Sequence, residues 1–483
     1  MRPLMLPDEG RYAAVAWEML RSGDWLTPTL DGLPFFHKPP LFYWITGAAL
    51  WLAGPTELAA RAASIVGATL GAFSLYLFTR RWCGAAAARR VLVLLLAQPL
   101  FFVAAQFANL DMLVAGCITA TVLALAHAAL GFEQGLPHRR VLWLGYGLAA
   151  LGVLAKGLIG FVLPAMIVGL WLLLRRRWRT LLALLSLPGL LLFAALAGPW
   201  FVAMQQRFDG FLHYFFVVQH FQRFSASGFN NAQPFWFYPV VVALCSLPAV
   251  LWLRGAFARG YFRAPGVQGA VRLLMLLAMG VVLLFFSAPK SKLLGYILPA
   301  VPPLAWLIAD ASAQAGESLA RRRRWWLTLA CGAALGLSLV VGLSLDPRHS
   351  ERGLGLALRA QHQDGEPVIM LRGYWYDVPF YARLRQPVLV VDDWGDPAIA
   401  QRDNWRKEVA DAGEFDPARA RQLLLPPQAL HAALCQARVT WVIGTTQSAA
   451  ELGLPAQAQA VYAQRGLTLW RVAAGKELKP PCA

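Results

Sequence analysis

The chain has 483 residues, of which 58% are hydrophobic and only 14% are charged, and its mean hydropathy is +0.50. Soluble domains average about one quarter charged residues, so this composition excludes a set of soluble domains and predicts a polytopic membrane protein. The net charge of +18 would also suit a nucleic-acid binder. However, the basic residues cluster in short connectors between apolar runs, which is typical of the positive-inside rule, so we expect no nucleic acid partner.

The amino-terminal segment, residues 1–56, is more polar than the sequence that follows it. Residues 8–21 have the spacing of a short amphipathic helix lying at a membrane interface. The residues on its apolar face are Tyr12, Val15, Ala16 and Met19. Residues 41–52 are apolar but too short to span with ease, which predicts an interfacial or re-entrant segment. Since an external segment of this length needs a preceding helix for its export, we expect an upstream transmembrane helix to be missing from the chain.

Residues 57–345 form the expected transmembrane domain. Apolar runs long enough to cross a bilayer occur at about 57–81, 89–107, 111–132, 139–155, 158–174, 179–197, 236–254, 270–288, 294–311 and 325–345. They predict about ten to twelve transmembrane helices. Every second connector is rich in arginine and is expected in the cytoplasm. The alternate connectors, which include the loop 199–235, are therefore expected on the periplasmic side.

Residues 346–483 change character, because charged residues return and apolar runs shorten to strand length. The expected strands are 367–371, 388–391, 440–443 and 467–472. Residues 418–437 are expected to be helical. The predicted fold class is thus a polytopic α-helical membrane protein with a small C-terminal α/β domain in the periplasm. Cys435 and Cys482 both lie in this domain and could form a disulfide there.

Acidic residues occur at two places on the predicted external face. Asp8 and Glu9 are adjacent at the start of the first predicted helix, and Asp111 lies where an external hairpin enters an apolar run. All three also suit the first turn of a helix, where acidic side chains are favoured. Ionisable groups at membrane depth are costly and are usually functional. We therefore predict a catalytic carboxylate site, suited to general-base chemistry or to binding a cationic group.

Basic residues on the same face run against the positive-inside bias, so topology does not explain them. They are Lys38, Lys156, Arg223, Lys290 and Lys292. Each of them alone would suit the anchoring of a lipid headgroup. Together they predict a pocket for an anionic group, most naturally a phosphate. Tyr296 could add a hydroxyl donor to this pocket.

Several of these residues belong to motifs that recur in order in one family. The motifs are Asp8-Glu9-Gly10-Arg11-Tyr12, Gly23-Asp24-Trp25, HKPPLFYW at 37–44, Asn109-Leu110-Asp111-Met112, Lys156-Gly157, HFQRF at 220–224 and SAPKSKLLGYILP at 287–299. With them the chain resembles the bacterial 4-amino-4-deoxy-L-arabinose lipid A transferases, which are relatives of the protein O-mannosyltransferases and have the GT-C fold. The resemblance covers residues 7–310 well and the C-terminal domain loosely.

The resemblance implies an inverting transfer of a sugar, expected to be 4-amino-4-deoxy-L-arabinose, from undecaprenyl phosphate to a phosphate of lipid A. The site would face the periplasm from the inner membrane. Asp8 and Asp111 would be the essential carboxylates, with Glu9 beside them. Lys38, Arg223 and Tyr296 would hold the carrier phosphate. The other expected substrate-binding residues are Arg11, Tyr12, Lys156, Lys290 and Lys292.

The chain departs from the family pattern at its metal ligands. The family has a glutamate where His37 stands and another before the histidine at 220, and these positions are associated with a bound divalent metal. We expect the transfer to need no cofactor, but His37 and His220 could hold a structural zinc ion or another divalent metal, or remain ordinary loop residues. We expect a monomer.

Two rival functions stay open. One is the same chemistry with another sugar, or with a protein or glycan acceptor. The other is a transporter of lipid-linked sugars without catalysis. A transporter predicts internal repeats and charges near the midplane. Charges gathered on one external face favour the enzyme.

Overall fold

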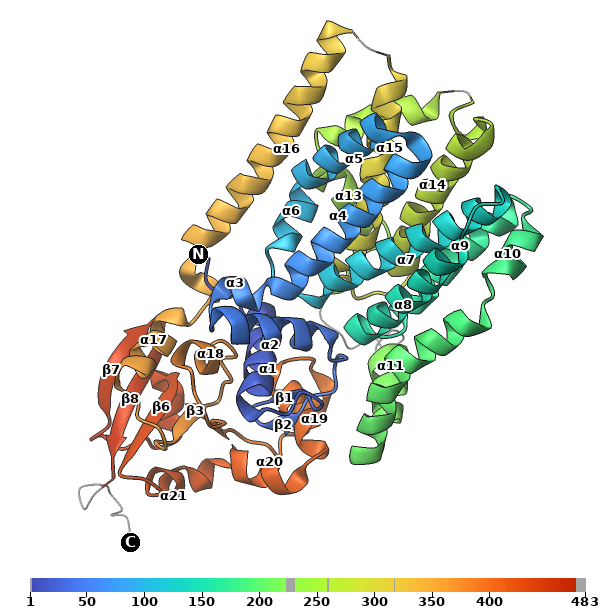
Figure 1. The fold of residues 1–483 in the computed structure, drawn as a ribbon. Coiled ribbons are helices and arrows are strands. Elements are labelled where there is room, and N and C mark those ends of the chain that lie inside the picture. The colour runs from blue at the N-terminus through green and yellow to red at the C-terminus, as the bar shows by residue number, and fades with distance from the viewer. Residues whose placement is uncertain (1, 223–230, 259, 317, 475–483) are drawn as a thin grey trace.

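The structure, a computed structural model, describes residues 2–222, 231–258, 260–316 and 318–474. Figure 1 shows a bundle of helices, which forms the upper part of the molecule, and an α/β unit below it. The amino-terminal helices α1 (Asp8–Ser22), α2 (Leu41–Ala53) and α3 (Glu57–Ala60) lie between these two parts. The polar segment that the sequence singled out is therefore enclosed by the rest of the chain.

Helix α1 confirms the helix predicted at 8–21, and it ends where Gly23 adopts a left-handed φ of 73°. Its predicted apolar face is buried as expected. However, most of the polar side of α1 is covered by protein as well, because helix α18 (Val378–Ala382) packs on α1 and Trp17 donates a hydrogen bond to the carbonyl oxygen of Leu384. This corrects the expectation of a surface helix, since protein covers both of its faces.

A short hairpin of β1 (Thr29–Leu30) and β2 (Leu33–Pro34) follows α1. The buried carboxylate of Glu18 accepts hydrogen bonds from the amides of Asp31 and Gly32 in its turn, at 2.7 and 2.9 Å. Asp31 in turn accepts one from the amide of Val388, at 2.8 Å. The hairpin thus links the amino-terminal segment to the C-terminal unit.

The bundle consists of the helices after α3. They are α4 (Ala62–Cys83), α5 (Ala85–Ala97), α6 (Pro99–Ala105), α7 (Leu110–Glu133), α8 (Arg139–Lys156), α9 (Ile159–Leu174), α10 (Trp178–Leu184), α11 (Leu187–Arg207), η1 (His213–Gln222), α13 (Phe237–Cys245), η2 (Ala249–Phe257), η3 (Tyr261–Arg263), α14 (Gly266–Ser287), η4 (Leu294–Ala300), α15 (Val301–Gln314) and α16 (Leu319–Leu345). Helix α7 is almost wholly buried at the centre. A Cβ atom at Gly116 would lie 2.1 Å from the carbonyl oxygen of Gly67, so α4 and α7 cross in backbone contact.

Among the described residues, six helices are long and apolar enough to cross a membrane, or eight if each of two bent helix pairs is one span. This number is below the predicted ten to twelve because some apolar runs form shorter helices. The run 158–174 forms the 16-residue helix α9, and the run 179–197 is divided between α10 and α11. The molecule is nevertheless a multi-pass membrane protein by the length and composition of its helices.

The C-terminal unit is built on a six-stranded sheet with the order β5-β4-β3-β6-β8-β7. Its strands are β3 (Val368–Leu371), β4 (Leu389–Val391), β5 (Leu424–Leu425), β6 (Val439–Thr445), β7 (Gln459–Gln464) and β8 (Leu467–Ala473). Strands β5, β4, β3 and β6 are parallel, whereas β8 is antiparallel to both β6 and β7. The four predicted strands are confirmed as β3, β4, β6 and β8.

The helices of this unit are η5 (Pro347–His349), α17 (Arg352–Gln361), α18, η6 (Pro397–Gln401), α19 (Trp405–Glu414), α20 (Pro417–Leu423), η7 (Pro427–Ala429), α21 (Leu430–Leu434) and α22 (Thr446–Glu451). The predicted helix 418–437 is interrupted by strand β5. Cys435 takes part in a disulfide bond, whereas Cys482 lies outside the described residues.

Candidate active site

Two of the predicted carboxylates meet where α1 approaches the start of α7. Asn109 precedes α7, and its side-chain oxygen accepts a hydrogen bond from the amide of Asp111 at 2.8 Å, which caps the helix. The amide nitrogen of the same side chain donates to Oδ2 of Asp8 at 3.4 Å. One asparagine therefore joins the first turns of the two helices and brings Asp8 and Asp111 into one site.

Asp111 is buried and forms an ion pair with Lys156. Lys156 is the last residue of α8, because Gly157 follows it with a φ of 95°, a conformation that favours glycine. The ammonium group of Lys156 also lies 4.5 Å from the centre of the Tyr296 ring, within range of a cation–π interaction. Asp111, Lys156 and Tyr296, which come from three separate elements, thus form one cluster.

The backbone of η4 forms a wall of this cluster. A Cβ atom added to Gly295 would lie 2.1 Å from Oδ2 of Asp111, so only a glycine fits against the carboxylate. The hydroxyl of Tyr238 donates to the carbonyl oxygen of Leu293 at 3.0 Å and holds the chain that leads into η4. The position of the Asp111 carboxylate is therefore set from both sides, by Lys156 and by Gly295.

Arg11 lies one turn after Asp8 and binds its carboxylate, with 2.6 Å between Nη2 and Oδ1. The other arm of the guanidinium forms an ion pair with Glu408 of helix α19. Tyr12 is buried against the rings of Phe42 and Tyr43, with centroid separations of 5.6 and 6.3 Å. This burial raises the pKa of the Tyr12 hydroxyl well above its usual value, so it stays a neutral hydrogen-bonding group.

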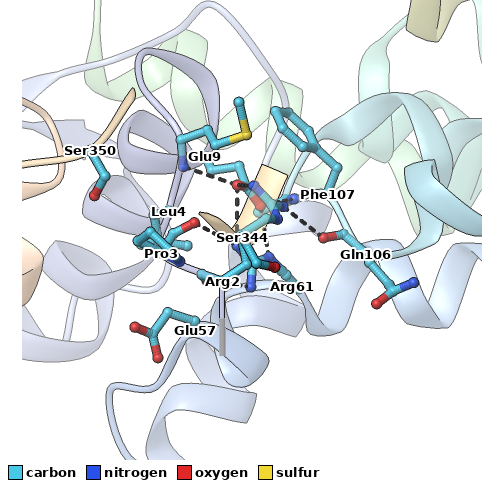
Figure 2. A network of polar contacts seen from close by, with 12 residues as sticks. Arg2, Pro3, Leu4, Glu9, Glu57, Arg61, Gln106, Phe107, Ser344 and Ser350 are labelled. Atoms are coloured by element: carbon cyan, nitrogen blue, oxygen red, sulfur yellow. Dashed lines mark hydrogen bonds and ion pairs between the residues drawn. The ribbon is translucent and has the colours of Figure 1, made fainter. Parts of the chain in front are cut away.

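Glu9 occupies a different environment, shown in Figure 2. Its carboxylate is fully buried and pairs with Arg2 at 2.6 Å and with Arg61 at 2.8 Å. The amides of Met5 and Ala108 also donate to it, at 3.0 and 2.8 Å. Both oxygens are occupied by protein donors. The geometry therefore gives Glu9 a structural role, in contrast to the catalytic role predicted from the sequence.

The predicted lysines of the loop before η4 are placed by backbone contacts. The ammonium of Lys292 donates to the carbonyl oxygens of Pro289 and Gln233, so it ties two loops together. Burial lowers the pKa of this ammonium. Lys290 is exposed, and its carbonyl oxygen accepts from the amide of Gln233 at 3.0 Å. A phosphate-binding role for these two lysines stays a prediction.

Two of the remaining predicted residues, His37 and Lys38, lie in the loop before α2. His37 is buried, with its ring 4.5 Å from that of Phe35, and Lys38 is half-buried beside it. Arg223 and the side chain of His220 lie outside the described residues. No group of three or more possible metal ligands from His, Cys, Asp and Glu occurs in the part of the chain that the structure describes. The zinc pair therefore stays a prediction.

Sequence reasoning missed the residues that the C-terminal unit adds to this site. Glu408 lies 397 residues after Arg11, and it also accepts a hydrogen bond of 2.5 Å from the Tyr376 hydroxyl. The aromatic run Tyr374-Trp375-Tyr376 is a weak signal of a special position. Nothing in the local sequence of α19 marks Glu408, since a helical carboxylate is ordinarily a solvated residue.

Comparisons with known proteins show which proteins the whole chain resembles. A family model described as dolichyl-phosphate-mannose-protein mannosyltransferase matches residues 37–202. The chain is 38% identical over 349 residues to the undecaprenyl phosphate-α-4-amino-4-deoxy-L-arabinose arabinosyl transferase 1 of Sodalis glossinidius, a match that covers 71% of this chain. It is 32% identical over 377 residues, 77% of this chain, to the corresponding transferase of Pectobacterium carotovorum. The chain is thus similar to this transferase family over most of its own length.

The resemblance stated from the motifs is thus confirmed. The matches cover 61% and 65% of these two relatives' own length. Among solved structures, the chain is similar to ArnT from Cupriavidus metallidurans bound to undecaprenyl phosphate, with a TM-score of 0.82 and 23% identity. The apo structure of that protein gives 0.78 and 22%. Each match covers 98% of this chain and 95% of the other, and it shows the GT-C fold of the transferase family.

Proposed function

We propose that the protein is an inverting glycosyltransferase that moves 4-amino-4-deoxy-L-arabinose from undecaprenyl phosphate to a phosphate of lipid A. The observation that carries this proposal is the convergence of Asp8 and Asp111 with the cations Arg11 and Lys156 at one end of the bundle. The names of the relatives supply the sugar and the carrier.

The roles of the residues follow from the chemistry of the leaving group. The carrier phosphate departs from the anomeric carbon as an anion, so cations at this position stabilise the transition state. Lys156 is one such cation in the site, and Lys38 and Arg223 are assigned to the same task by the family motifs. An in-line attack from the opposite face of the sugar inverts the anomeric centre.

The carboxylates have a different task from the cations. An acceptor phosphate is already ionised and needs no general base. Asp8 and Asp111 then bind the ammonium of the aminosugar and orient the ring. If the acceptor were a hydroxyl, one aspartate would have to remove its proton. The Asp8 side chain suits contact with substrate, since a third of it is open to solvent.

We further place the protein in the bacterial inner membrane as a monomer, with the site and the C-terminal unit in the periplasm. The arrangement of charge along the helices supports this orientation. Helix α4 ends in Arg80 and Arg81, and helix α8 begins at Arg139, each at the end opposite to the site. Shorter helices such as α9 would also cross, which brings the count towards the ten to twelve of the sequence prediction.

The test is a transfer assay with the purified chain in liposomes. Undecaprenyl phosphate-linked aminoarabinose and lipid A are supplied, and the products are analysed by mass spectrometry. Lipid A should gain the mass of one aminoarabinose residue, and this gain should disappear when Asp8 is replaced by asparagine. Transport of the donor across the bilayer without any product would contradict the proposal in favour of a transporter. Transfer to another supplied acceptor would correct the assigned acceptor.

A further inference from the structure

The C-terminal unit reaches the candidate site through a chain of polar contacts. The hydroxyl of Tyr376 donates to Oε2 of Glu408, whose Oε1 pairs with Nη1 of Arg11. The other arm of Arg11, Nη2, binds Oδ1 of Asp8 at 2.6 Å. The guanidinium also lies 5.8 Å from the centre of the Tyr376 ring. Residues separated by almost the whole length of the chain therefore contact one another here.

We propose that Glu408 is a positioning residue for Asp8, acting through Arg11, so that the C-terminal unit completes the active site. The planar guanidinium offers two parallel pairs of donors in a fixed geometry, and here each arm serves a different carboxylate. Because Glu408 holds one arm of the Arg11 guanidinium, the other arm can bind Oδ1 of Asp8 in only one orientation. Oδ2 of Asp8 is then directed towards Asn109 and the substrate space.

The charges of this triad give Glu408 a second effect. Asp8 and Arg11 alone would form a neutral pair, whereas the addition of Glu408 leaves the three groups with a net charge of −1. Burial alone would raise the pKa of Glu408, but Arg11, His37 and the Tyr376 hydroxyl together hold it below its usual value. Glu408 is therefore ionised at neutral pH. Arg11 is thus shared between two carboxylates and does not compensate the charge of Asp8 alone.

Burial separates this contact from an ordinary surface ion pair. The side chains of Arg11 and Glu408 are 13% and 9% exposed, so water competes little for their hydrogen bonds. Exposed pairs contribute little to a structure, but a buried pair with a third hydrogen-bonding partner fixes the orientation of its members. Removing Glu408 would leave the buried Arg11 free to turn towards Asp8 with both arms.

The experiment compares Glu408→Gln with a matched control, Asp392→Asn, in the full-length protein. Asp392 is equally buried, at 8% exposed, and pairs with Arg406 at 3.1 Å within the C-terminal unit. The control loses a buried ion pair of the same domain without contact to α1. Two quantities are measured for each variant: steady-state sugar transfer, and hydrogen–deuterium exchange of the amides at the start of α1.

We expect Glu408→Gln to lower kcat by roughly 10- to 100-fold, because small displacements of a positioned group have effects of this size. The KM for the donor should change less than the kcat, since Asp8, Asp111 and the phosphate contacts are retained. The amides of residues 8–12 should exchange faster than in the control. Tyr376→Phe removes only the hydroxyl that orients Glu408, so it should show the same changes at smaller amplitude. If Glu408→Gln does not fold, Tyr376→Phe tests the positioning role in its place.

The kinetic part of this inference rests on the proposed transferase activity. If the wild-type protein transfers no sugar, the proposed function fails, and the exchange comparison alone decides on Glu408. If the wild type is active and Glu408→Gln matches Asp392→Asn in kcat, the positioning role is overturned while the proposed function stands. Equal exchange at the start of α1 in the two variants would likewise overturn it.

Discussion

At the scale of single residues, neighbouring acids of similar chemistry have different roles. Asp8 has one oxygen bound by Arg11 and is partly exposed, whereas both oxygens of Glu9 are occupied inside the protein. The sequence predicted an acidic site but could not distinguish these two residues. What separates them is a pair of arginines, at positions 2 and 61, whose contact with Glu9 is a property of the tertiary structure. The spacing of residues along the sequence does not predict such contacts.

Asp111→Asn should lower the rate of transfer by at least about 100-fold, because it removes a charge fixed at the reacting centre. The substitution also leaves Lys156 as a buried cation without its counter-ion, which costs about 3–5 kcal/mol of stability. We therefore expect both the kcat and the midpoint of thermal unfolding to fall. Transfer assays and thermal denaturation of the purified variant check these outcomes.

The double variant Asp111→Asn, Lys156→Met separates the two effects of that substitution. Replacing both members of a buried pair removes the uncompensated charge, so the unfolding midpoint should return close to that of the wild type. The rate of transfer should stay low. Recovery of activity in the double variant would show that the single variant failed only through instability and would remove both Asp111 and Lys156 from the catalytic set.

Gly295→Ala should inactivate the protein through the position of Asp111. The added methyl group would lie 2.1 Å from Oδ2 of Asp111, so the carboxylate must move away from Lys156. We expect a loss of kcat on the order of 100-fold, together with a fall in the unfolding midpoint, because the buried pair with Lys156 is weakened. Gly280→Ala in α14 is the matched control, since nothing lies within 4 Å of its added methyl group. Equal activity of the two variants would contradict the tight fit.

At the scale of elements, Glu9 connects four segments that are distant in the sequence. Glu9 itself belongs to α1, and it binds Arg2 at the start of the chain. It also binds Arg61, between α3 and α4, and the amide of Ala108, ahead of α7 (Figure 2). The orientation of α1 relative to α4 and α7, and hence the approach of Asp8 to Asn109, depends on this junction.

Glu9→Gln should therefore destabilise the protein far more than it changes the chemistry. Two buried guanidinium groups would lose their counter-charge, at a cost of about 3–5 kcal/mol. Thermal unfolding of the purified protein measures this loss. Asp346→Asn, which breaks the exposed ion pair with Arg348, serves as a control and should leave the midpoint unchanged. A Glu9→Gln variant that is stable but inactive would return Glu9 to the catalytic residues.

Most elements were predictable from hydrophobic patterns alone. Helix α1 and the four strands β3, β4, β6 and β8 lie where the hydrophobic periodicity predicted them. The local sequence predicts such elements because burial of one face, or of a whole strand, requires apolar residues at regular spacing. The two-residue strand β5 has no such pattern. The burial of the polar side of α1 was also missed, since its cover comes from residues more than 360 positions away.

At the scale of the whole molecule, the C-terminal unit and the amino-terminal segment form one body. The amide of Leu4 donates to the Tyr381 hydroxyl, the amide of Leu6 donates to the carbonyl oxygen of His349, and the Asp31 carboxylate accepts from the amide of Val388. The sequence predicted a separate domain after residue 346, because composition changes there. A change in amino-acid composition indicates where a new folding unit begins, but it does not predict which other segment that unit packs against.

Asp377 lies in this contact and gives it a dependence on pH. Its Oδ2 accepts hydrogen bonds of 2.8 Å from the Ser350 hydroxyl and from the amide of Glu351. A Cβ atom on Gly10 of α1 would come within 3.0 Å of the Asp377 amide nitrogen, so the two segments touch here. Burial, with a contribution from the neighbouring charge of Glu351, raises the pKa of Asp377 to about 7.

The stability of the protein should therefore fall as the pH rises from about 4 to about 7. In this range the folded state keeps the proton on Asp377, whereas the unfolded chain, with a pKa of about 3.9, has lost it. The folded state binds more protons, so the free energy of unfolding decreases by up to about 1.4 kcal/mol per pH unit and levels off above pH 7. Asp377→Asn cannot ionise and should have a shallower profile. Unfolding midpoints of the two proteins between pH 5 and pH 8 test this difference, and parallel profiles would show that Asp377 titrates normally in the folded state.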